Sequence, residues 1–319
     1  MEATLSHYRI EKQIGAGGKG EPIVANTSIP TQKRMTGMLG HPVAENPIDR
    51  MFDAVYSHYR LNWQFWKCDV PSEKELGAAI AGVRALGFAG ACITVPYKVA
   101  AIPYLDEADA DVRAIGAVNW MTIKEGRLTG HNNDGKGVVK AIQKVTPIAG
   151  KRVAMLGAGG AGRAMAVELA WAGAAHMTII TRRESQGVEV ADLVTRASGV
   201  PAEWLPWSDE VVIPEGTEIL MNATHLGCAP DLEFVPVDWC SIPGKTTVVD
   251  VITNPRLTPF LQKARNKGCP LVDGVEMLVQ LAMQIFEAWT GVKPIEAVFQ
   301  QAVAVALGEP GHRHLQASA

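Results

Sequence analysis

The feature that most constrains the fold is the segment of residues 151–164, KRVAMLGAGGAGRA. It reads as a buried strand over residues 153–156, a glycine-rich turn, and a helix of small and apolar residues that opens at Ala161. Glycines spaced G-x-G-x-x-G let the chain turn sharply, let a pyrophosphate approach the backbone and let helix and strand pack closely. Because a further strand follows over residues 177–180, the segment predicts a dinucleotide-binding unit. Its phosphate-binding turn comprises Gly157, Ala158, Gly159, Gly160, Ala161 and Gly162.

The composition is ordinary for a soluble globular protein, with 47% apolar and 20% charged residues. At 319 residues the chain is long enough for two domains, and its net charge of −3 favours neither a nucleic acid nor an anionic membrane as partner. No apolar run reaches membrane-spanning length, and we expect no secretory signal. We predict reduced thiols in a cytoplasm, because the cysteines are odd in number and form no C-x-x-C pair. Since the histidines have no ligand spacing either, we predict no metal.

Strands and helices alternate along the rest of the chain, which is typical of an α/β protein. Before residue 134 we expect strands at residues 35–39, 65–70, 91–95, 120–124 and 128–131, and helices at 48–59, from a capping box at 72–75, and at 106–114. After it we expect strands at 177–180, 218–222, 247–251 and 271–273, and helices at 137–145, 188–198, 258–267, 276–289 and 295–307. Alternation of this kind in the second half predicts a doubly wound parallel sheet.

The N-terminal residues 1–33 contain a second G-x-G-x-x-G pattern, formed by Gly15, Gly17 and Gly20. It resembles the opening of a protein-kinase glycine-rich loop. No V-A-I-K lysine, H-R-D or D-F-G element follows, so a kinase is excluded. We expect residues 1–33 to be a flexible or loosely docked extension.

Several short motifs occur in a fixed order over residues 35–291. They are Thr94-Val95-Pro96-Tyr97-Lys98, Gly116-Ala117-Val118-Asn119, Asn132-Asn133-Asp134-Gly135, GAGGAGRA, Asn222-Ala223-Thr224, Asp250 with Asn254-Pro255, and Asp273-Gly274 with Met277-Leu278 and Trp289-Thr290-Gly291. Together they resemble the shikimate/quinate dehydrogenase family. The resemblance implies an α/β substrate domain joined to a Rossmann domain, with the active site between them. It places the extension at 1–33, the substrate domain at 34–134 and 276–310, the Rossmann domain at 135–275 and a tail at 311–319.

The resemblance implies that Lys98 and Asp134 form the catalytic pair. Elementary chemistry agrees, because interconverting an alcohol and a ketone needs a group that exchanges the hydroxyl proton while hydride moves. A lysine desolvated beside an aspartate can supply it. The alternative reading is a surface lysine and an aspartate that caps a helix. The resemblance also implies that Asn119 contacts the hydroxyls of a small hydroxylated substrate such as shikimate or 3-dehydroshikimate.

The sequence departs from the family where the family holds a carboxylate. The loop of residues 40–47, GHPVAENP, lacks the family's two serines, and Thr253 replaces a tyrosine. Leu281 takes the place of a glutamine, although Gln280 is adjacent, and Cys92 and Asn133 are further replacements. We expect the substrate-binding residues to be Asn119, Thr94, Asn46, Thr253 and Gln280.

These losses suggest a hypothesis about the substrate. Since two carboxylate contacts are missing together, we expect a related hydroxylated substrate, such as a cyclitol or sugar derivative, whose carboxylate is absent or placed elsewhere. Glu45 would repel such a group, unless Glu45 and Asn46 simply face solvent. Alternatively, Arg50 or Arg34 replaces the lost contacts and the substrate is shikimate itself.

The end of the second Rossmann strand indicates the cofactor. NAD enzymes usually have an acid there, whereas arginine accommodates the phosphate of NADP. Here Thr181, Arg182 and Arg183 occupy the position, so we predict NADP, and Glu184 leaves use of NAD open. The resemblance adds Asn222, Ala223, Thr224 and Gly274 to the cofactor-binding residues.

A non-catalytic NAD(P)-binding sensor is the alternative from another class of protein. Retention of Lys98 and Asp134 argues against it, because a binding protein has no need of an acid–base pair. Many dehydrogenases of the family are dimers. We therefore expect a homodimer, although no feature of the sequence locates an interface.

Overall fold

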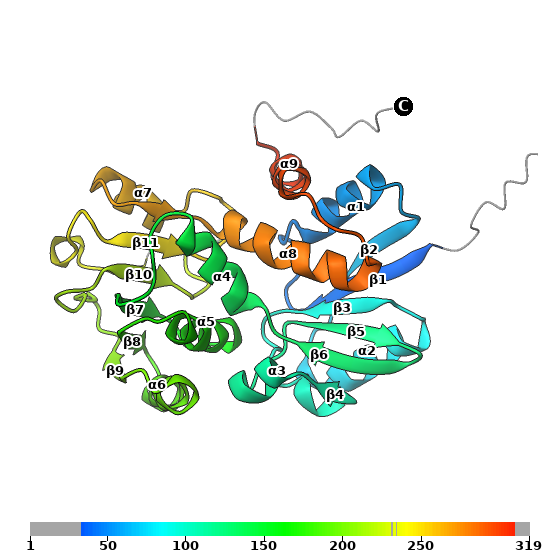
Figure 1. The fold of residues 1–319 in the computed structure, drawn as a ribbon, viewed down its shortest axis with the longest axis horizontal. Coiled ribbons are helices and arrows are strands. Elements are labelled where there is room, and N and C mark those ends of the chain that lie inside the picture. Colours follow the sequence, from blue (N-terminus) through cyan, green and yellow to red (C-terminus); the bar gives the residue numbers. More distant parts are fainter. Residues whose placement is uncertain (1–32, 231, 234, 310–319) are drawn as a thin grey trace, which may run out of the picture. The chain divides into compact units, whose positions relative to one another are not determined.

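The structure is a computed structural model that describes residues 33–230, 232–233 and 235–309 (Figure 1). The predicted extension, with Gly15, Gly17 and Gly20, lies outside the described residues except for Lys33. The predicted tail of residues 311–319 lies outside them as well.

The glycine-rich segment lies at the centre of a parallel sheet. Its strand β7 (Arg152–Leu156) pairs with β10 (Ile219–Asn222) and β8 (His176–Thr181), in the order β12-β11-β10-β7-β8-β9. The remaining strands are β9 (Ala202–Pro206), β11 (Thr247–Asp250) and β12 (Leu271–Val272), and the helices between strands are α5 (Gly160–Trp171), α6 (Glu184–Ser198) and α7 (Pro259–Asn266). This is the strand order of a Rossmann fold, which binds its ligand where the order reverses between β7 and β10. The predicted doubly wound sheet is confirmed.

Strand β9 was not expected from the sequence. It pairs with β8 at the edge of the sheet, and Pro201 and Pro206 bracket it. Edge strands tolerate proline because one side of the strand donates no ladder hydrogen bonds. Trp204 on this strand packs against Gly187 of α6, where an added Cβ would lie 1.9 Å from Trp204 Cδ1. Such a strand depends on its neighbours more than on its own short AEWLP sequence.

The first half of the chain forms a mixed sheet in the order β2-β1-β3-β5-β6-β4. Its strands are β1 (Arg34–Gly40), β2 (Trp63–Asp69), β3 (Gly90–Ile93), β4 (Glu107–Ala108), β5 (Trp120–Lys124) and β6 (Arg127–His131), with helices α1 (Ile48–His58), α2 (Glu73–Ala85) and α3 (Ala110–Ile115). β1 is parallel to β2 and β3, whereas β5 is antiparallel to β3 and β6. The predicted hairpin turns at Glu125 (φ 51°) and Gly126 (φ 74°), as a two-residue hairpin turn requires.

Two local predictions in this half are corrected. The helix expected at residues 106–114 starts only at Ala110, because residues 107–108 pair with β6 as β4. Asp109 caps this helix through its Oδ1, which accepts from the Val112 N–H at 2.8 Å. At the capping box, the Ser72 hydroxyl bonds to the Glu75 carboxylate and not to a backbone N–H.

The last two helices return to the first sheet. Helix α8 (Gly274–Thr290) packs against α4 (Asp134–Gln143), and α9 (Glu296–Ala306) packs against α1 (Figure 1). Aromatic side chains pack α8 and α9 against α1: the ring centroid of Phe52 in α1 lies 5.6 Å from that of Trp289 and 6.5 Å from that of Phe299. Trp289 also donates its indole N–H to the Met121 carbonyl at 3.1 Å. This association accords with the predicted substrate domain, whose boundaries stay a prediction.

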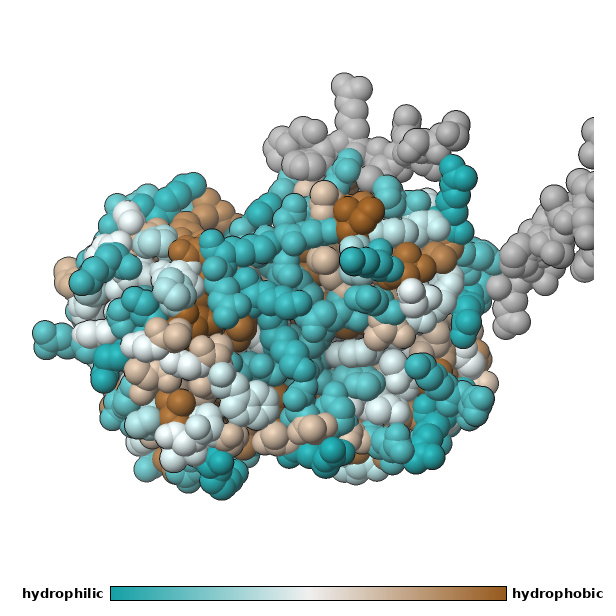
Figure 2. Space-filling model, viewed as in Figure 1, coloured by the Kyte–Doolittle hydropathy of each residue, from teal (hydrophilic) through white to brown (hydrophobic). Residues whose placement is uncertain are grey.

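Polar residues lie over the junction of the two halves. On the face drawn in Figure 2, hydrophilic residues gather over α4 and the adjoining part of α8. Lys144, directly after α4, forms ion pairs with Glu276 of α8 and Glu296 of α9. In the described part of the chain, no helix has the length and apolarity that crossing a bilayer requires, and no three His, Cys, Asp or Glu side chains gather as a metal site.

A buried carboxyl group at the end of β11 ties the loops of the parallel sheet together. Asp250 accepts hydrogen bonds from the Thr258 hydroxyl at 2.6 Å, the Ile252 N–H at 3.1 Å and the Asn222 amide at 3.2 Å. Burial raises the pKa of Asp250 from 3.8 to about 7, although these hydrogen bonds oppose the rise.

We predict that Asp250 makes unfolding depend on pH. A raised pKa in the folded state means that its stability contribution is fully present below pH 3.8 and is lost as pH rises through about 7. The change is on the order of 4 kcal/mol. Chemical unfolding of wild type and Asp250→Asn between these pH values measures it, because the difference cancels other titrating groups. A constant difference would contradict the prediction.

Candidate active site

Lysine 98 lies at the carboxyl end of the first sheet. Strands β1 and β3 are parallel and end at the same edge, and the turn of residues 94–98 follows β3. Two hydrogen bonds fix this turn: the Tyr97 hydroxyl donates to the Val70 carbonyl at 2.6 Å, and the Val118 N–H donates to the Lys98 carbonyl at 2.8 Å. The backbone of Lys98 is therefore held from both sides.

Lys98 and Asp134 form a buried ion pair, as the sequence predicts. Lys98 Nζ donates to Asp134 Oδ2, and the two residues are 9% and 3% exposed. Asp134 is the first residue of α4, where the free backbone N–H groups of the helix favour a negative charge. The alternative of a solvated surface lysine is therefore wrong.

Three asparagines surround this pair. Asn119 Nδ2 donates to Asp134 Oδ1 and to Asn133 Oδ1, both at 2.9 Å. Asn132 Oδ1 accepts from the Asp134 N–H at 3.2 Å, and Asn133 Nδ2 donates to the Leu281 carbonyl at 3.0 Å. Asn119 thus orients Asp134, in addition to its predicted contact with substrate. Sequence analysis did not assign a role to Asn132 or Asn133, although the N-N-D run was the available signal.

The glycine-rich turn lies directly against the lysine. A Cβ added to Gly160 would lie 2.8 Å from Lys98 Cβ, so only glycine permits this approach. Gly157 has φ 98°, and a Cβ there would lie 2.8 Å from Thr224 Cγ2. At Gly159 a Cβ would meet no atom within 4 Å, which leaves open space before the first turn of α5. This space, beside unpaired helix N–H groups, fits the pyrophosphate of a dinucleotide.

The residues after β10 shape the turn from the other side. Asn222 is fully buried; its Nδ2 donates to the Leu226 carbonyl and to Asp250 Oδ1, both at 3.2 Å, and its Oδ1 accepts from the Thr224 N–H at 3.1 Å. Its side chain is thus committed within the protein, and it positions the predicted cofactor-binding residues Ala223 and Thr224. Gly274, also predicted to bind the cofactor, allows close packing of the backbone: a Cβ there would lie 2.3 Å from the Ile252 carbonyl oxygen.

The end of β8 offers two free guanidinium groups. The Thr181 hydroxyl donates to the Arg183 carbonyl at 2.9 Å and accepts from Trp204 Nε1 at 3.1 Å, which fixes the turn. Arg182 and Arg183 are exposed and form no ion pair with any described residue. Two unpaired arginines at this strand end fit the additional phosphate of NADP. Glu184, which follows them, opens α6.

The predicted substrate-binding residues differ in what their side chains contact. Thr94 is half-buried and lies against Gly40 at the end of β1, where a Cβ would be 2.2 Å from Thr94 Cγ2. Asn46 Oδ1 accepts from the Ile48 N–H at 3.0 Å, so this oxygen serves the start of α1. Thr253 is half-buried in the loop after β11.

The side chains of Gln280 and Arg34 do not lie beside the ion pair of Lys98 and Asp134. Gln280 Nε2 donates to Glu276 at 3.1 Å, whereas the adjacent Leu281 contacts Asn133 through its carbonyl. One residue along a helix rotates the side chain by about 100°, which accounts for the difference. Arg34 lies at the amino end of β1, the opposite end of the strand, with its guanidinium 5.2 Å from the Trp63 ring centroid.

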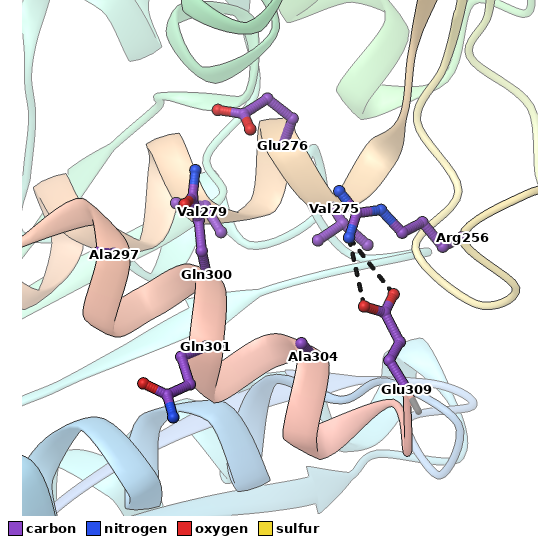
Figure 3. Close-up of a pocket in the computed structure, with 9 residues that line it drawn as sticks. All are labelled: Arg256, Val275, Glu276, Val279, Ala297, Gln300, Gln301, Ala304 and Glu309. Atoms are coloured by element: carbon purple, nitrogen blue, oxygen red, sulfur yellow. Dashed lines mark hydrogen bonds and ion pairs between the residues drawn. The ribbon is translucent and has the colours of Figure 1, made fainter. Parts of the chain in front are cut away.

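A polar groove of about 460 Å³ lies between α8 and α9 (Figure 3). Arg256 at its edge pairs with Glu309 at 3.4 Å and with Asp273 at 2.9 Å. None of the predicted catalytic residues lines the groove. Its ion pairs fasten the loop after β11 to the start of α8 and to the residues that follow α9.

Comparisons with known proteins identify the family of this chain. Residues 38–121 match the family model described as shikimate dehydrogenase substrate binding domain. Shikimate dehydrogenase (NADP(+)) of Bacillus cereus strain G9842 is 34% identical over 86% of this chain and 99% of its own length.

Two solved structures are similar over 86% of this chain. The ligand-free 5-ketofructose reductase of Gluconobacter sp. strain CHM43 is 41% identical, with 99% of that chain covered and a TM-score of 0.78. Shikimate 5-dehydrogenase of Thermus thermophilus, in complex with NADP(H) and shikimate, is 30% identical, with 100% covered and a TM-score of 0.75. These relatives confirm the predicted fold and the prediction of an NADP-dependent oxidoreductase. The chain therefore belongs to the shikimate dehydrogenase family of NADP-dependent alcohol oxidoreductases.

Proposed function

We propose that this enzyme reduces a neutral, polyhydroxylated ketone such as a keto-sugar with NADPH, and catalyses the reverse oxidation. The observation that carries the proposal is the loop between β1 and α1, GHPVAENP. It has no serine or threonine to bind a carboxylate, and its acidic residue Glu45 is exposed without an ion pair in the described chain.

Two further observations support a neutral substrate. His41, the basic residue of the loop, is engaged by the Asp69 carboxylate at 3.0 Å. Arg34, an alternative partner for a carboxylate, lies at the far end of β1. Arg50, the other alternative partner, is exposed in the first turn of α1, directly after the loop. A carboxylate without a partner is costly to desolvate, so shikimate is the weaker candidate unless Arg50 binds it. The relative with 41% identity is a 5-ketofructose reductase, and its name describes a substrate of the proposed class.

The proposed halves of the site follow the two sheets. Residues 34–134 and 276–310 would hold the substrate, and residues 135–275 would hold the cofactor. The glycines of the turn at residues 157–162 and the arginines at 182 and 183 would bind NADP. A bound NADPH supplies the hydride.

The chain's own residues supply the proton. Lys98 Nζ donates a proton to the carbonyl oxygen as hydride reaches the carbonyl carbon, so the ketone becomes a secondary alcohol. Asp134 holds the lysine in place through their ion pair, and Asn119 holds Asp134. In the oxidative direction the neutral lysine takes the hydroxyl proton back. The exclusion of water by the surrounding buried asparagines strengthens these contacts.

We further propose a cytoplasmic homodimer. The five scattered cysteines are free thiols, which suits a reducing compartment. The proposal of a dimer is supported only by the occurrence of dimers among members of the family.

Loss of the proton donor should abolish turnover. We expect Lys98→Met to lower kcat by about 100-fold or more. The single variant leaves Asp134 as a buried unpaired charge, so the double variant Lys98→Met/Asp134→Asn is the companion that removes both charges. Steady-state rates and thermal unfolding separate catalysis from folding. Lys140→Met on the exposed face of α4 is the control, and an active, folded double variant would contradict the role.

The substrate class is tested by competition between ketones. With NADPH we expect kcat/KM for 5-ketofructose to exceed that for 3-dehydroshikimate by about 100-fold. The loss of NADPH absorbance measures both rates, and Lys98→Met is the blank. A preference for 3-dehydroshikimate would overturn the proposed substrate and leave the family assignment intact.

Cofactor choice should depend on the two arginines. We expect Arg182→Ala/Arg183→Ala to raise KM for NADPH about tenfold or more and to change KM for NADH less than about twofold. The physical reason is that only NADPH has the additional phosphate. Arg196→Ala, at the other end of α6, is the matched control. Equal effects on both cofactors would show that the arginines act only on stability.

A further inference from the structure

Glu45 is a charged group that the proposed reaction does not use. It lies in the loop that follows β1, and its carboxylate forms no hydrogen bond or ion pair with any described residue. An acidic residue that only faces solvent does not require an anchored backbone. The backbone beside Glu45, in contrast, is held by hydrogen bonds.

The backbone on both sides of Glu45 is anchored. Lys67 Nζ donates to the Ala44 carbonyl at 2.7 Å and to the Asn46 carbonyl at 3.2 Å, and it pairs with Asp49 at 3.3 Å. One ammonium group thus binds the carbonyl before Glu45 and the carbonyl after it. Such anchoring reduces the conformational entropy that a ligand would have to remove on binding.

The loop also lies next to the turn that carries the lysine. The His41 N–H donates to the Val95 carbonyl at 2.9 Å, and Gly40 contacts Thr94. The loop therefore borders residues 94–98, at the carboxyl end of the first sheet.

Glu45 is near the second sheet as well. Burial raises the pKa of the Cys228 thiol, and the charges of Asp250 and Glu45 raise it further. Cys228 belongs to the loop after β10, and its neighbour Ala229 donates its N–H to the Asn254 carbonyl at 2.9 Å, beside Thr253. The loop that carries Glu45 is therefore within electrostatic range of the loop after β10.

We propose that Glu45 is the residue that recognises the substrate, accepting hydrogen bonds from two neighbouring hydroxyls of a neutral keto-sugar. A carboxylate has two acceptor oxygens and no donor, so it matches a pair of hydroxyl donors and repels a substrate carboxylate. The inference rests on the proposed function, since it names the part of the substrate opposite the reacting carbonyl.

The test uses the full chain with NADPH and compares Glu45→Gln with wild type. Glutamine keeps the size, removes the charge and replaces one acceptor by a donor. We expect KM for 5-ketofructose to rise about tenfold while kcat stays within about threefold. We also expect kcat/KM for 3-dehydroshikimate to rise, because the repulsion is removed. Glu215→Gln, an exposed acid at the amino end of β10, is the control and should change neither value.

The outcomes separate the inference from the proposed function. If wild type reduces 5-ketofructose and Glu45→Gln matches it on both ketones, Glu45 has no role in recognition and the inference is wrong. If wild type prefers 3-dehydroshikimate, the proposed function fails and the inference falls with it. A fall in kcat with unchanged KM would instead place Glu45 among groups that act on the reacting centre, and this too would overturn recognition.

Discussion

The buried ion pair between Lys98 and Asp134 is the interaction on which the rest of the site depends. Removing two charges from water costs several kcal/mol per ion, and their attraction compensates only when the remaining donors and acceptors are satisfied. Here Asn119 donates to the free oxygen of Asp134, and the start of α4 stabilises its charge. Asn133 then joins the same network to α8. The network explains why three asparagines occupy positions that could otherwise hold apolar side chains.

Close backbone approach is the second constraint. Gly160 has no room for a Cβ beside Lys98, and Gly135 has none beside Glu168 of α5, whose Cγ would be 2.4 Å away. Gly137 has little room against Leu281 of α8, at 3.2 Å. Three glycines therefore set how closely α4, α5 and the lysine turn approach one another. The glycine-rich turn therefore needs glycine at residue 160 for the protein's own packing.

Sequence patterns predicted the features that are local. The strand, turn and helix around Gly157 are contained in one segment, and the motifs around Lys98 and Asp134 were specific enough to pair two residues far apart in the chain. The sequence patterns did not predict strands that form only because an adjacent strand pairs with them. Strand β9 exists because β8 offers it a partner, and residues 107–108 form β4 against β6. The hydrogen bond between Asn222 and Asp250 joins two strands and follows from no spacing rule, whereas that between Gln280 and Glu276 has the i,i+4 spacing of one helix and was available from the sequence.

The ion pair and the loop around Glu45 are stabilised by different kinds of contact. The ion pair of Lys98 and Asp134 is fixed by side chains, so any substitution there disturbs a buried network. The loop around Glu45 is fixed by Lys67 through backbone carbonyls, which every residue type provides. The side chain of Glu45 takes no part in this anchoring, unlike that of Asn46, which accepts from the Ile48 N–H. The charge at position 45 can therefore change without loss of the anchor that Lys67 provides, and such a change leaves the ion pair of Lys98 and Asp134 intact.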